Sequence, residues 1–436
     1  MSPLLSLIKT HKAGKASGVY AVCSANPLVL KAALLQAKQN QSILLVEATS
    51  NQVNQFGGYT GMQPSDFKSF LEDIANSVEF PLDKLILGGD HLGPNCWQDD
   101  CAQVAMHKSE QLISAYVSAG FEKIHLDCSM ACADDTLPLD DAIIAERAAR
   151  LCQIAEQTYR KRPKENVDQR APLYVIGTEV PVPGGAQEDL EPKLEVTKTE
   201  DASNTLMLHL EAFERRGLTD AWQRVIALVV QPGVEFDHQS IIEYQPQAAQ
   251  LLSKSLDNNP NLVFEAHSTD YQPAAAFEAL VRDHFAILKV GPALTFALRE
   301  VLFALADIEN QLIPFSQQSQ LKQTIEQVML AEPKYWQSYY QGSESEQHLA
   351  RQFSFSDRCR YYWPHPDISG AVDHLLANLS VQSIPVTLLS QYLPLQYQAI
   401  ISGQLINQPL AIIYFHIQQV TAPYARACQM DNHHEQ

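Results

Sequence analysis

The chain has 436 residues, more than the roughly 250–300 at which a single hydrophobic core usually stops growing, so we expect one large domain and an additional segment. Hydrophobic residues make up 46% and charged residues 19% of the sequence, which is typical of a globular protein. The net charge of −19 argues against nucleic acid and anionic membranes as partners, because an acidic surface repels both.

The N-terminal segment and the cysteines indicate the compartment. The apolar residues near the start are followed by Lys9, Lys12 and Lys15, which reverses the charge order of a signal peptide. No apolar run approaches the ~18 residues of a membrane span. The eight cysteines include no CxxC pair. Several of them, such as Cys23 and Cys128, are expected to be small buried residues, which fits a reducing compartment. These features predict a cytoplasmic protein.

Short β-branched apolar runs alternate with amphipathic helical patterns through the first two thirds of the chain. Such alternation is typical of parallel β/α architecture, and eight units within residues 1–311 predict a closed (β/α)8 barrel, the TIM barrel. An open doubly wound sheet is the competing architecture, but a glycine-rich dinucleotide loop is missing. The expected strands are Val19–Ser24, Ser42–Ala48, Lys84–Gly89, Lys123–Cys128, Leu173–Glu179, Val225–Val230, Leu262–Ala266 and Ala286–Val290.

Proline and asparagine mark the starts of several expected helices. Asn26 provides a capping side chain directly before Pro27, and Pro292 begins another helix, because proline at the first helical position loses no hydrogen bond. A polar loop, Pro181–Asn204, interrupts the pattern after the fifth strand. Beyond the barrel, residues 312–436 are expected to form a helical C-terminal appendage packed on it.

The segment Gly88–Pro94 (GGDHLGP) ends the third expected strand. Functional groups of a (β/α)8 barrel gather at such strand ends, and glycines there allow a ligand to approach the backbone closely. Asp90 can transfer a proton and His91 can bind a metal. The alternative is a structural turn in which Asp90 bonds to the backbone and His91 is merely packed.

A second polar motif, Glu265–Asp270, ends the seventh expected strand. Strand alternation puts Glu265 and His267 on one side, from which His267 can meet His91 across the barrel mouth. Two imidazoles and a carboxylate suit zinc or another divalent metal, with Glu265, Asp127 or Glu179 as the oxygen ligand. Glu179 is also a candidate for proton transfer. A satisfied buried polar network is the alternative interpretation.

Other polar residues are candidates for substrate binding. Lys289 ends the last strand just before a helix whose N-terminal N–H groups suit a phosphate. Arg358 and Arg360 lie among aromatic residues of the appendage, where docking on the barrel is the alternative role. His125 lies deeper in its strand and is expected to be a core histidine. The candidates are Ser24, Glu47, Asn51, Asp127, Lys289, Arg358 and Arg360.

Nine long segments carry a family resemblance. They are Asn51–Met62, Gly88–Trp97, Lys123–Asp127, Ile176–Gly185, Val230–His238, Glu265–Gln272, Asp283–Glu300, Ser356–Pro364 and Ser390–Pro394. With these segments the chain resembles, over nearly its whole length, the accessory subunit of class II D-tagatose-1,6-bisphosphate aldolase. The resemblance implies a non-catalytic protein that pairs with the catalytic aldolase subunit and supports its activity and stability. It also implies a role in D-tagatose 6-phosphate degradation, in galactitol or N-acetylgalactosamine catabolism.

The Asp90–His91 pair is similar to that of the catalytic zinc aldolases, in which the aspartate moves a proton and the histidine binds zinc. Those enzymes use three histidine ligands, whereas only His91 and His267 stand at strand ends here, which argues against retro-aldol cleavage. The alternative function is a metal-dependent epimerase or isomerase of ketohexose phosphates, with Asp90 or Glu179 moving the proton. A kinase is disfavoured because the phosphate-binding motif GxxxxGK[ST] is absent from the sequence.

Overall fold

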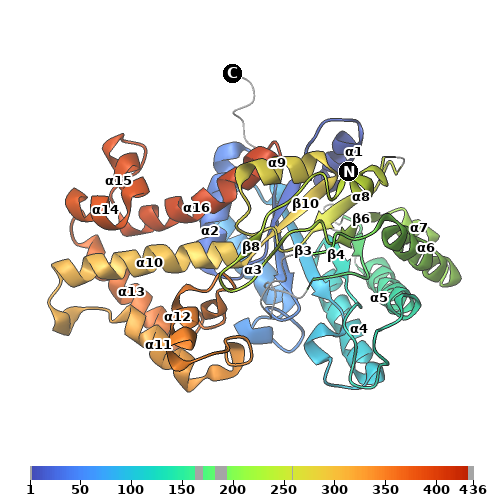
Figure 1. Cartoon of the computed structure of the whole chain (residues 1–436), viewed down its shortest axis with the longest axis horizontal. Coiled ribbons are helices and arrows are strands. Elements are labelled where there is room, and N and C mark those ends of the chain that lie inside the picture. The colour runs from blue at the N-terminus through green and yellow to red at the C-terminus, as the bar shows by residue number, and fades with distance from the viewer. Residues whose placement is uncertain (1, 163–169, 182–193, 258, 431–436) are drawn as a thin grey trace.

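The structure is a computed structural model and describes residues 2–162, 170–181, 194–257 and 259–430. Eight parallel strands close into a barrel in the order β1-β10-β9-β6-β5-β4-β3-β2, which confirms the predicted fold (Figure 1). Each strand overlaps one of the expected apolar runs, although β3 is longer and β5 shorter than expected. Their bounds are β1 Val19–Val22, β2 Leu44–Thr49, β3 Leu85–Leu92, β4 Lys123–Leu126, β5 Leu173–Ile176, β6 Val225–Val230, β9 Val263–Ala266 and β10 Phe285–Val290.

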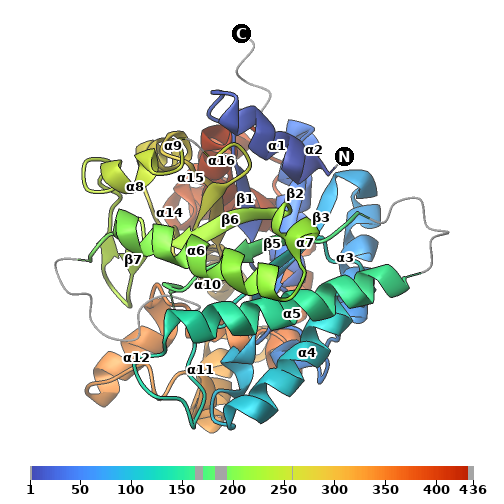
Figure 2. The same cartoon turned by 90° about the vertical axis from the view of Figure 1, so that its right-hand side faces the viewer.

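Helices cover the outside of the barrel, as Figures 1 and 2 show. The start of α2 follows the expected cap, because Asn26 Oδ1 accepts a hydrogen bond from the Leu28 N–H at 3.0 Å. The α10 helix begins at Pro292, as predicted. The helices of this part are α1 Pro3–Lys12, α2 Pro27–Asn40, α3 Pro64–Ser77, α4 Ala102–Ala119, α5 Asp141–Lys161, α6 Thr199–Arg215, α7 Thr219–Trp222, α8 Gln250–Lys254, α9 Ala274–Arg282 and α10 Pro292–Leu312.

The C-terminal part is helical, as expected, and extends to one side of the barrel (Figure 1). A 3-10 turn, η6, spans Arg358–Tyr361 and reaches the barrel mouth. The expected boundary near residue 311 stays a prediction. The helices are α11 Leu321–Ala331, α12 Glu344–Phe353, α13 Pro366–Ser380, α14 Val386–Tyr392, α15 Pro394–Ile401 and α16 Pro409–Ala427.

The last helix, α16, returns to the barrel and packs on α2, α9 and α10. The Tyr424 hydroxyl donates to the Thr269 carbonyl oxygen at 2.9 Å, and the Gly18 N–H, just before β1, donates to the Cys428 carbonyl oxygen at 3.1 Å. The first bond joins α16 to the loop after β9, and the second joins the residue after α16 to the start of β1. The α16 helix is therefore part of the outer layer of the barrel.

Two details differ from the sequence-based expectation. The α6 helix begins at Thr199, inside the expected loop Pro181–Asn204, because Glu200 and Asp201 in its first turn favour a helix N-terminus. Residues 182–193 of that loop, with the end of the Ile176–Gly185 motif, lie outside the described residues. A short antiparallel pair, β7 (Glu235–Phe236) and β8 (Ile241–Ile242), was not predicted, since two-residue strands carry no periodic signal.

Among the described helices, none has both the length and the hydropathy needed to cross a membrane. All eight cysteines are free thiols. Most are buried as expected, but Cys101, just before α4, is exposed, and Cys23 and Cys96 are partly buried.

Candidate functional site

Charged side chains meet inside the barrel. The ammonium of Lys123 on β4 is fully buried, and its Nζ lies 2.7 Å from Glu47 Oε1 on β2 and 2.7 Å from Glu265 Oε2 on β9. Glu47 is the register partner of Gly88 on β3, and a Cβ at that glycine would lie 2.7 Å from Glu47 Cγ. Gly88 therefore leaves the room that the Glu47 side chain needs in the barrel interior.

A second buried lysine joins these carboxylates. Lys289 Nζ on β10 lies 2.8 Å from Asp90 Oδ2 and forms an ion pair with Glu47. Burial alone would lower the pKa of Lys289, but the surrounding carboxylates, with Asp90 the strongest, raise it well above its ordinary value. Lys289 therefore stays an ammonium ion, whereas a Schiff-base lysine has to lose its proton.

Three imidazole rings stand beside these charges. The ring centroids of His91, His125 and His267 lie 5.0 to 5.3 Å apart. His125 Nδ1 lies 2.9 Å from Asp90 Oδ1, and His267 Nε2 lies 2.9 Å from Glu265 Oε1. Each of these two rings is thus oriented by a carboxylate. We call Glu47, Asp90, Lys123, His125, Glu265, His267 and Lys289 the interior cluster.

His91 is held in an uncommon backbone conformation at the end of β3, with φ of 47°. Its Nδ1 lies 2.7 Å from Asp127 Oδ2, and Asp127 in turn accepts a hydrogen bond from the Ser129 hydroxyl at 2.6 Å. Burial would lower the pKa of His91, but Asp90 and Asp127 raise it above its ordinary value. Left-handed conformations of non-glycine residues concentrate at functional sites, where the surrounding structure enforces them.

Burial and neighbouring charges set two further protonation states. Burial would raise the pKa of Asp90, but His91 and Lys289 outweigh it and hold that pKa well below its ordinary value. Burial lowers the pKa of His267 to about 4 against the opposing effect of Glu265. At neutral pH Asp90 is therefore a carboxylate and His267 is a neutral imidazole, the form that binds metals.

The interior cluster fits a divalent metal. Donor atoms of four of its residues lie within 4.8 Å of one another: Asp90, His125, Glu265 and His267. The buried Nε2 of His125 has no hydrogen-bond partner among the described residues, and a lone pair there is free for a metal when Nδ1 donates to Asp90. Four carboxylates, those of Glu47, Asp90, Asp127 and Glu265, outnumber the two ammonium groups. One of these carboxylates, that of Asp127, is paired with His91, and the other three still outnumber the ammonium groups, so the excess negative charge favours binding of a cation.

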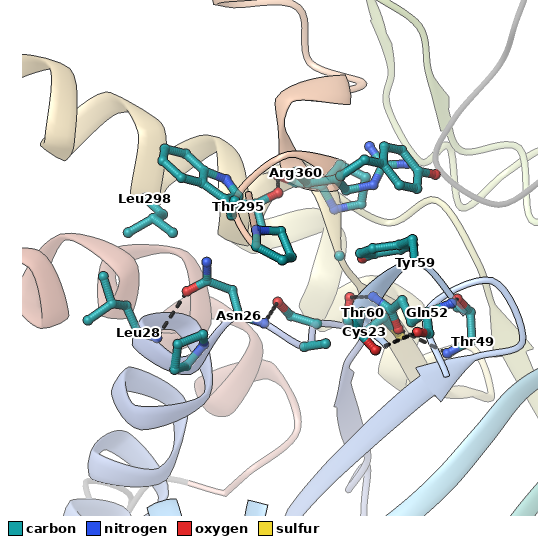
Figure 3. A pocket seen from close by; sticks show the side chains of 18 of the residues that line it. Cys23, Asn26, Leu28, Thr49, Gln52, Tyr59, Thr60, Thr295, Leu298 and Arg360 are labelled. Carbon is teal, nitrogen blue, oxygen red and sulfur yellow. Dashed lines mark hydrogen bonds between the residues drawn. The ribbon is translucent and has the colours of Figure 1, made fainter. Parts of the chain in front are cut away.

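Several of these side chains line a cavity of about 450 Å³ at the barrel mouth. Its lining includes Asp90, His91, His267 and Lys289. Figure 3 shows the cavity running from Tyr59 and Arg360 at one end to Leu28 and Leu298 at the other. The expected substrate-binding residues that line it are Ser24, Asn51, Lys289 and Arg360.

The other predicted site residues lie elsewhere. Glu47, Asp127 and Glu265 are buried and do not line the cavity. They pair with Lys289, His91 and His267, respectively, which do line it. Glu179 is exposed and accepts a hydrogen bond from Thr197. Since β5 ends at Ile176, strand alternation no longer determines the direction of the Glu179 side chain. Arg358 packs over Tyr339, with its guanidinium carbon 3.4 Å from the ring centroid, and does not reach the cavity.

The N-terminus of α10 is occupied by a side chain of the protein itself. Asp270 Oδ1 accepts hydrogen bonds from the N–H groups of Gly291 at 3.0 Å and Ala293 at 2.8 Å. Burial raises the pKa of Asp270 to about 6, opposed by these hydrogen bonds. The helix terminus that we expected to attract a phosphate therefore already holds a carboxyl group, which a phosphate would have to displace.

Two residues of the interior cluster were missed by the sequence analysis. His125 was expected to be a core histidine, and it is fully buried, but its ring belongs to the potential metal-binding group. Lys123 was taken only as the start of a strand. The signal that could have identified both is strand parity. Lys123 and His125 on β4 and Asp127 just after it stand at alternate positions, and three polar side chains on one side of a buried strand need partners.

The chain is similar to several solved structures. The crystal structure of a protein from Sinorhizobium meliloti 1021, described as a probable tagatose 6 phosphate kinase, is 46% identical in sequence with a TM-score of 0.86, over 94% of this chain and 100% of that one. The YdjI aldolase from Escherichia coli K12 aligns at 11% identity with a TM-score of 0.43, over 70% of this chain and 86% of that one. The fructose-bisphosphate aldolase from Campylobacter jejuni aligns at 14% identity with a TM-score of 0.41, over 86% and 91%.

A family model matches almost the whole chain. It covers residues 4–429 and is described as D-tagatose-1,6-bisphosphate aldolase subunit GatZ/KbaZ-like. The extent of this match and the 46% identity over 94% of the chain agree with the resemblance carried by the motifs. The chain therefore belongs to the GatZ/KbaZ-like family of D-tagatose-1,6-bisphosphate aldolase subunits.

Proposed function

We propose that this protein binds a phosphorylated ketohexose in the cavity and epimerises or isomerises it with a divalent metal. The observation that carries the proposal is the group Asp90, His125, Glu265 and His267, whose donor atoms lie within 4.8 Å of one another. Two of them, Asp90 and His267, line the cavity. A metal bound there would polarise a carbonyl group or hold vicinal hydroxyls of the sugar.

The residues of the chain would provide the proton transfer. Asp90 is a carboxylate at neutral pH and lines the cavity, so the oxygen that does not bind the metal can accept a proton from a carbon or hydroxyl of the substrate. His91 contacts the same cavity and has a raised pKa, so it can donate a proton in return. Glu179, the other proton-transfer candidate, is exposed and outside the cavity lining, and we assign it no step.

Arg360 would hold the phosphate. Its guanidinium lines the cavity and donates to the backbone carbonyls of Ser356 and Asp357. Among the described residues it forms no ion pair with a carboxylate, although buried charges are usually paired. An anionic group of the substrate is the natural partner for this cation.

The decisive experiment measures metal content and turnover of the purified chain alone. We expect near-stoichiometric divalent metal by mass spectrometry, and conversion of D-tagatose 6-phosphate to another hexose phosphate by NMR. His267→Ala is expected to lose both metal and activity. His107→Ala, a surface histidine on α4 paired with Glu110, is the matched control and should retain both. Full activity of metal-stripped protein would exclude the metal-dependent reaction.

The accessory role is a second candidate, and the family description as an aldolase subunit favours it. In this role the chain would increase the activity and lifetime of a catalytic class II aldolase subunit in D-tagatose 6-phosphate degradation. The test compares cleavage of tagatose 1,6-bisphosphate by that subunit with and without this chain. A longer half-life or a higher rate, together with no turnover by this chain alone, would favour the accessory role over the epimerase.

The description of the Sinorhizobium protein suggests a third activity, phosphorylation of tagatose 6-phosphate. No phosphate-binding loop of the GxxxxGK[ST] type occurs in this sequence, and the α10 N-terminus is occupied by Asp270. We therefore do not propose a kinase. Incubation with ATP and tagatose 6-phosphate is a control in the turnover assay.

A further inference from the structure

The tip of the C-terminal part has an unusual surface composition. Between Asp373 and Arg426 the sequence contains no Asp, Glu, Lys or Arg, although charged residues make up 19% of the chain. This stretch forms the end of α13, all of α14 and α15, and most of α16. Charged residues are normally the main component of a solvent-exposed surface, whereas the centres of protein interfaces are depleted of them.

Large apolar side chains are exposed on the same tip. Val381 is 85% exposed, Ile401 60% and Ile406 65%, and Val386, Leu395 and Leu410 are exposed as well. Their helices pack on one another, α14 on α15 and α15 on α16. Contiguous exposed apolar surface is uncommon on monomeric proteins and marks interaction sites. We call this region, formed by residues 381–410, the uncharged tip.

The charge of the rest of the molecule indicates what covers the uncharged tip. The net charge is −19, and apart from Arg426, Asp431 and Glu435 every charged residue lies in residues 1–373. A basic partner would bind preferentially to the acidic surface formed by residues 1–373. An acidic partner would be repelled by that surface but not by the uncharged tip. The chain itself is such an acidic partner. Exposed amides of the tip, such as Gln398 and Gln404, both donate and accept hydrogen bonds and can pair with their own copies.

The position of the tip favours the same occupant. Figure 1 shows α14 and α15 at one end of the long axis, with the strands of the barrel well away from them. Two copies joined tip to tip would hold their acidic barrels apart, beyond the ~8 Å over which charges act at physiological salt. We propose that the uncharged tip is the interface of a homodimer, in which the same surface of two copies meets around a two-fold axis.

The test is the oligomeric state of the full chain by analytical ultracentrifugation across a concentration series. We expect a dimer that persists or tightens as salt is raised, because salt screens the remaining repulsion between the barrels. Ile401→Asp and Ile406→Asp should each raise the dissociation constant at least tenfold. Leu251→Asp is the matched control, since Leu251 on α8 is as exposed but lies on the barrel, and it should dimerise like the wild type.

Two outcomes would overturn the proposal. One is a monomeric wild type at the highest concentration, with or without binding of the tip to a catalytic aldolase subunit. The other is a dimer that all three variants form equally well. Thermal melting of each variant, monitored by circular dichroism, separates loss of the interface from loss of the fold.

Discussion

Gly93, in the turn after β3, lies so close to the neighbouring backbone that no side chain fits there. A Cβ at this position would lie 1.6 Å from the Asp127 carbonyl oxygen, so alanine can be accommodated only if β3 and β4 move apart. We expect Gly93→Ala to destabilise the protein by more than about 3 kcal/mol, in the range of severe overpacking. Gly370→Ala on α13 is the control, because nothing lies within 4 Å of its Cβ position and alanine favours a helix. Melting temperatures check both, and an unchanged Gly93→Ala variant would contradict this account.

His209 on α6 makes stability depend on pH. It is fully buried, its Nδ1 lies 2.8 Å from the Thr205 carbonyl oxygen, and burial lowers its pKa to about 4 against the opposing effect of that bond. The unfolded chain therefore binds a proton near pH 6.5 that the folded chain does not, and stability falls as pH decreases from about 6.5 towards 4.

At about pH 5 the loss due to this one group is about 2 kcal/mol. We expect His209→Gln, which cannot titrate, to lose less stability than the wild type between neutral pH and pH 5, as measured by urea unfolding. His107→Gln on the surface of α4 is the control and should follow the wild type. Equal slopes for all three proteins would show that His209 is not the cause.

At the scale of elements, η6 is attached to α10 by a buried ion pair. Arg299 Nε lies 2.9 Å from Asp357 Oδ1, both side chains are inaccessible to solvent, and the Arg299 guanidinium lies 4.4 Å from the centre of the Phe296 ring. Removing one partner leaves the other charge buried and unpaired, which costs about 3–5 kcal/mol. We expect Asp357→Asn and Arg299→Met each to destabilise strongly, and the double variant to lose less than the sum. A double-mutant cycle in urea measures this coupling, and additive losses would contradict it.

The sequence alone predicts the strands and the residues at their ends, but not the contacts between side chains inside the barrel. The eight strands follow from local apolar runs, and the convergence of Asp90, His91, His267 and Lys289 follows from the parallel barrel, which brings all strand ends to one face. The pairing of Lys123 with Glu47 and Glu265 could not be predicted, because it depends on how strands distant in sequence are staggered across the barrel. The separation of Arg358 from Arg360 depends on the single turn η6, whose geometry no periodic pattern specifies.

At the scale of the whole molecule, α16 completes the outer layer next to the first strand. Tyr424 packs on Phe277 with ring centroids 3.9 Å apart and donates a hydrogen bond to Thr269. We expect a chain ending before Pro409 to expose α2 and α9 and to be recovered only in aggregated form. Tyr424→Phe loses the hydroxyl alone and should fold with a loss of about 1 kcal/mol. Solubility and urea unfolding test the two variants, and a soluble, cooperative truncated chain would contradict this role of α16.

The packing of α16 on α2 and α9 has a consequence for synthesis. Since α16 follows α2 and α9 in the chain, the surfaces of these two helices that α16 covers stay exposed until α16 has been made. The α9 helix ends at Arg282 and α16 begins at Pro409, so at about 5–20 residues per second this surface stays exposed for roughly 6–25 s. The nascent chain therefore exposes apolar surface during that interval. We expect this protein to depend more on a chaperone that binds nascent chains than a barrel whose final helix directly follows its eighth strand.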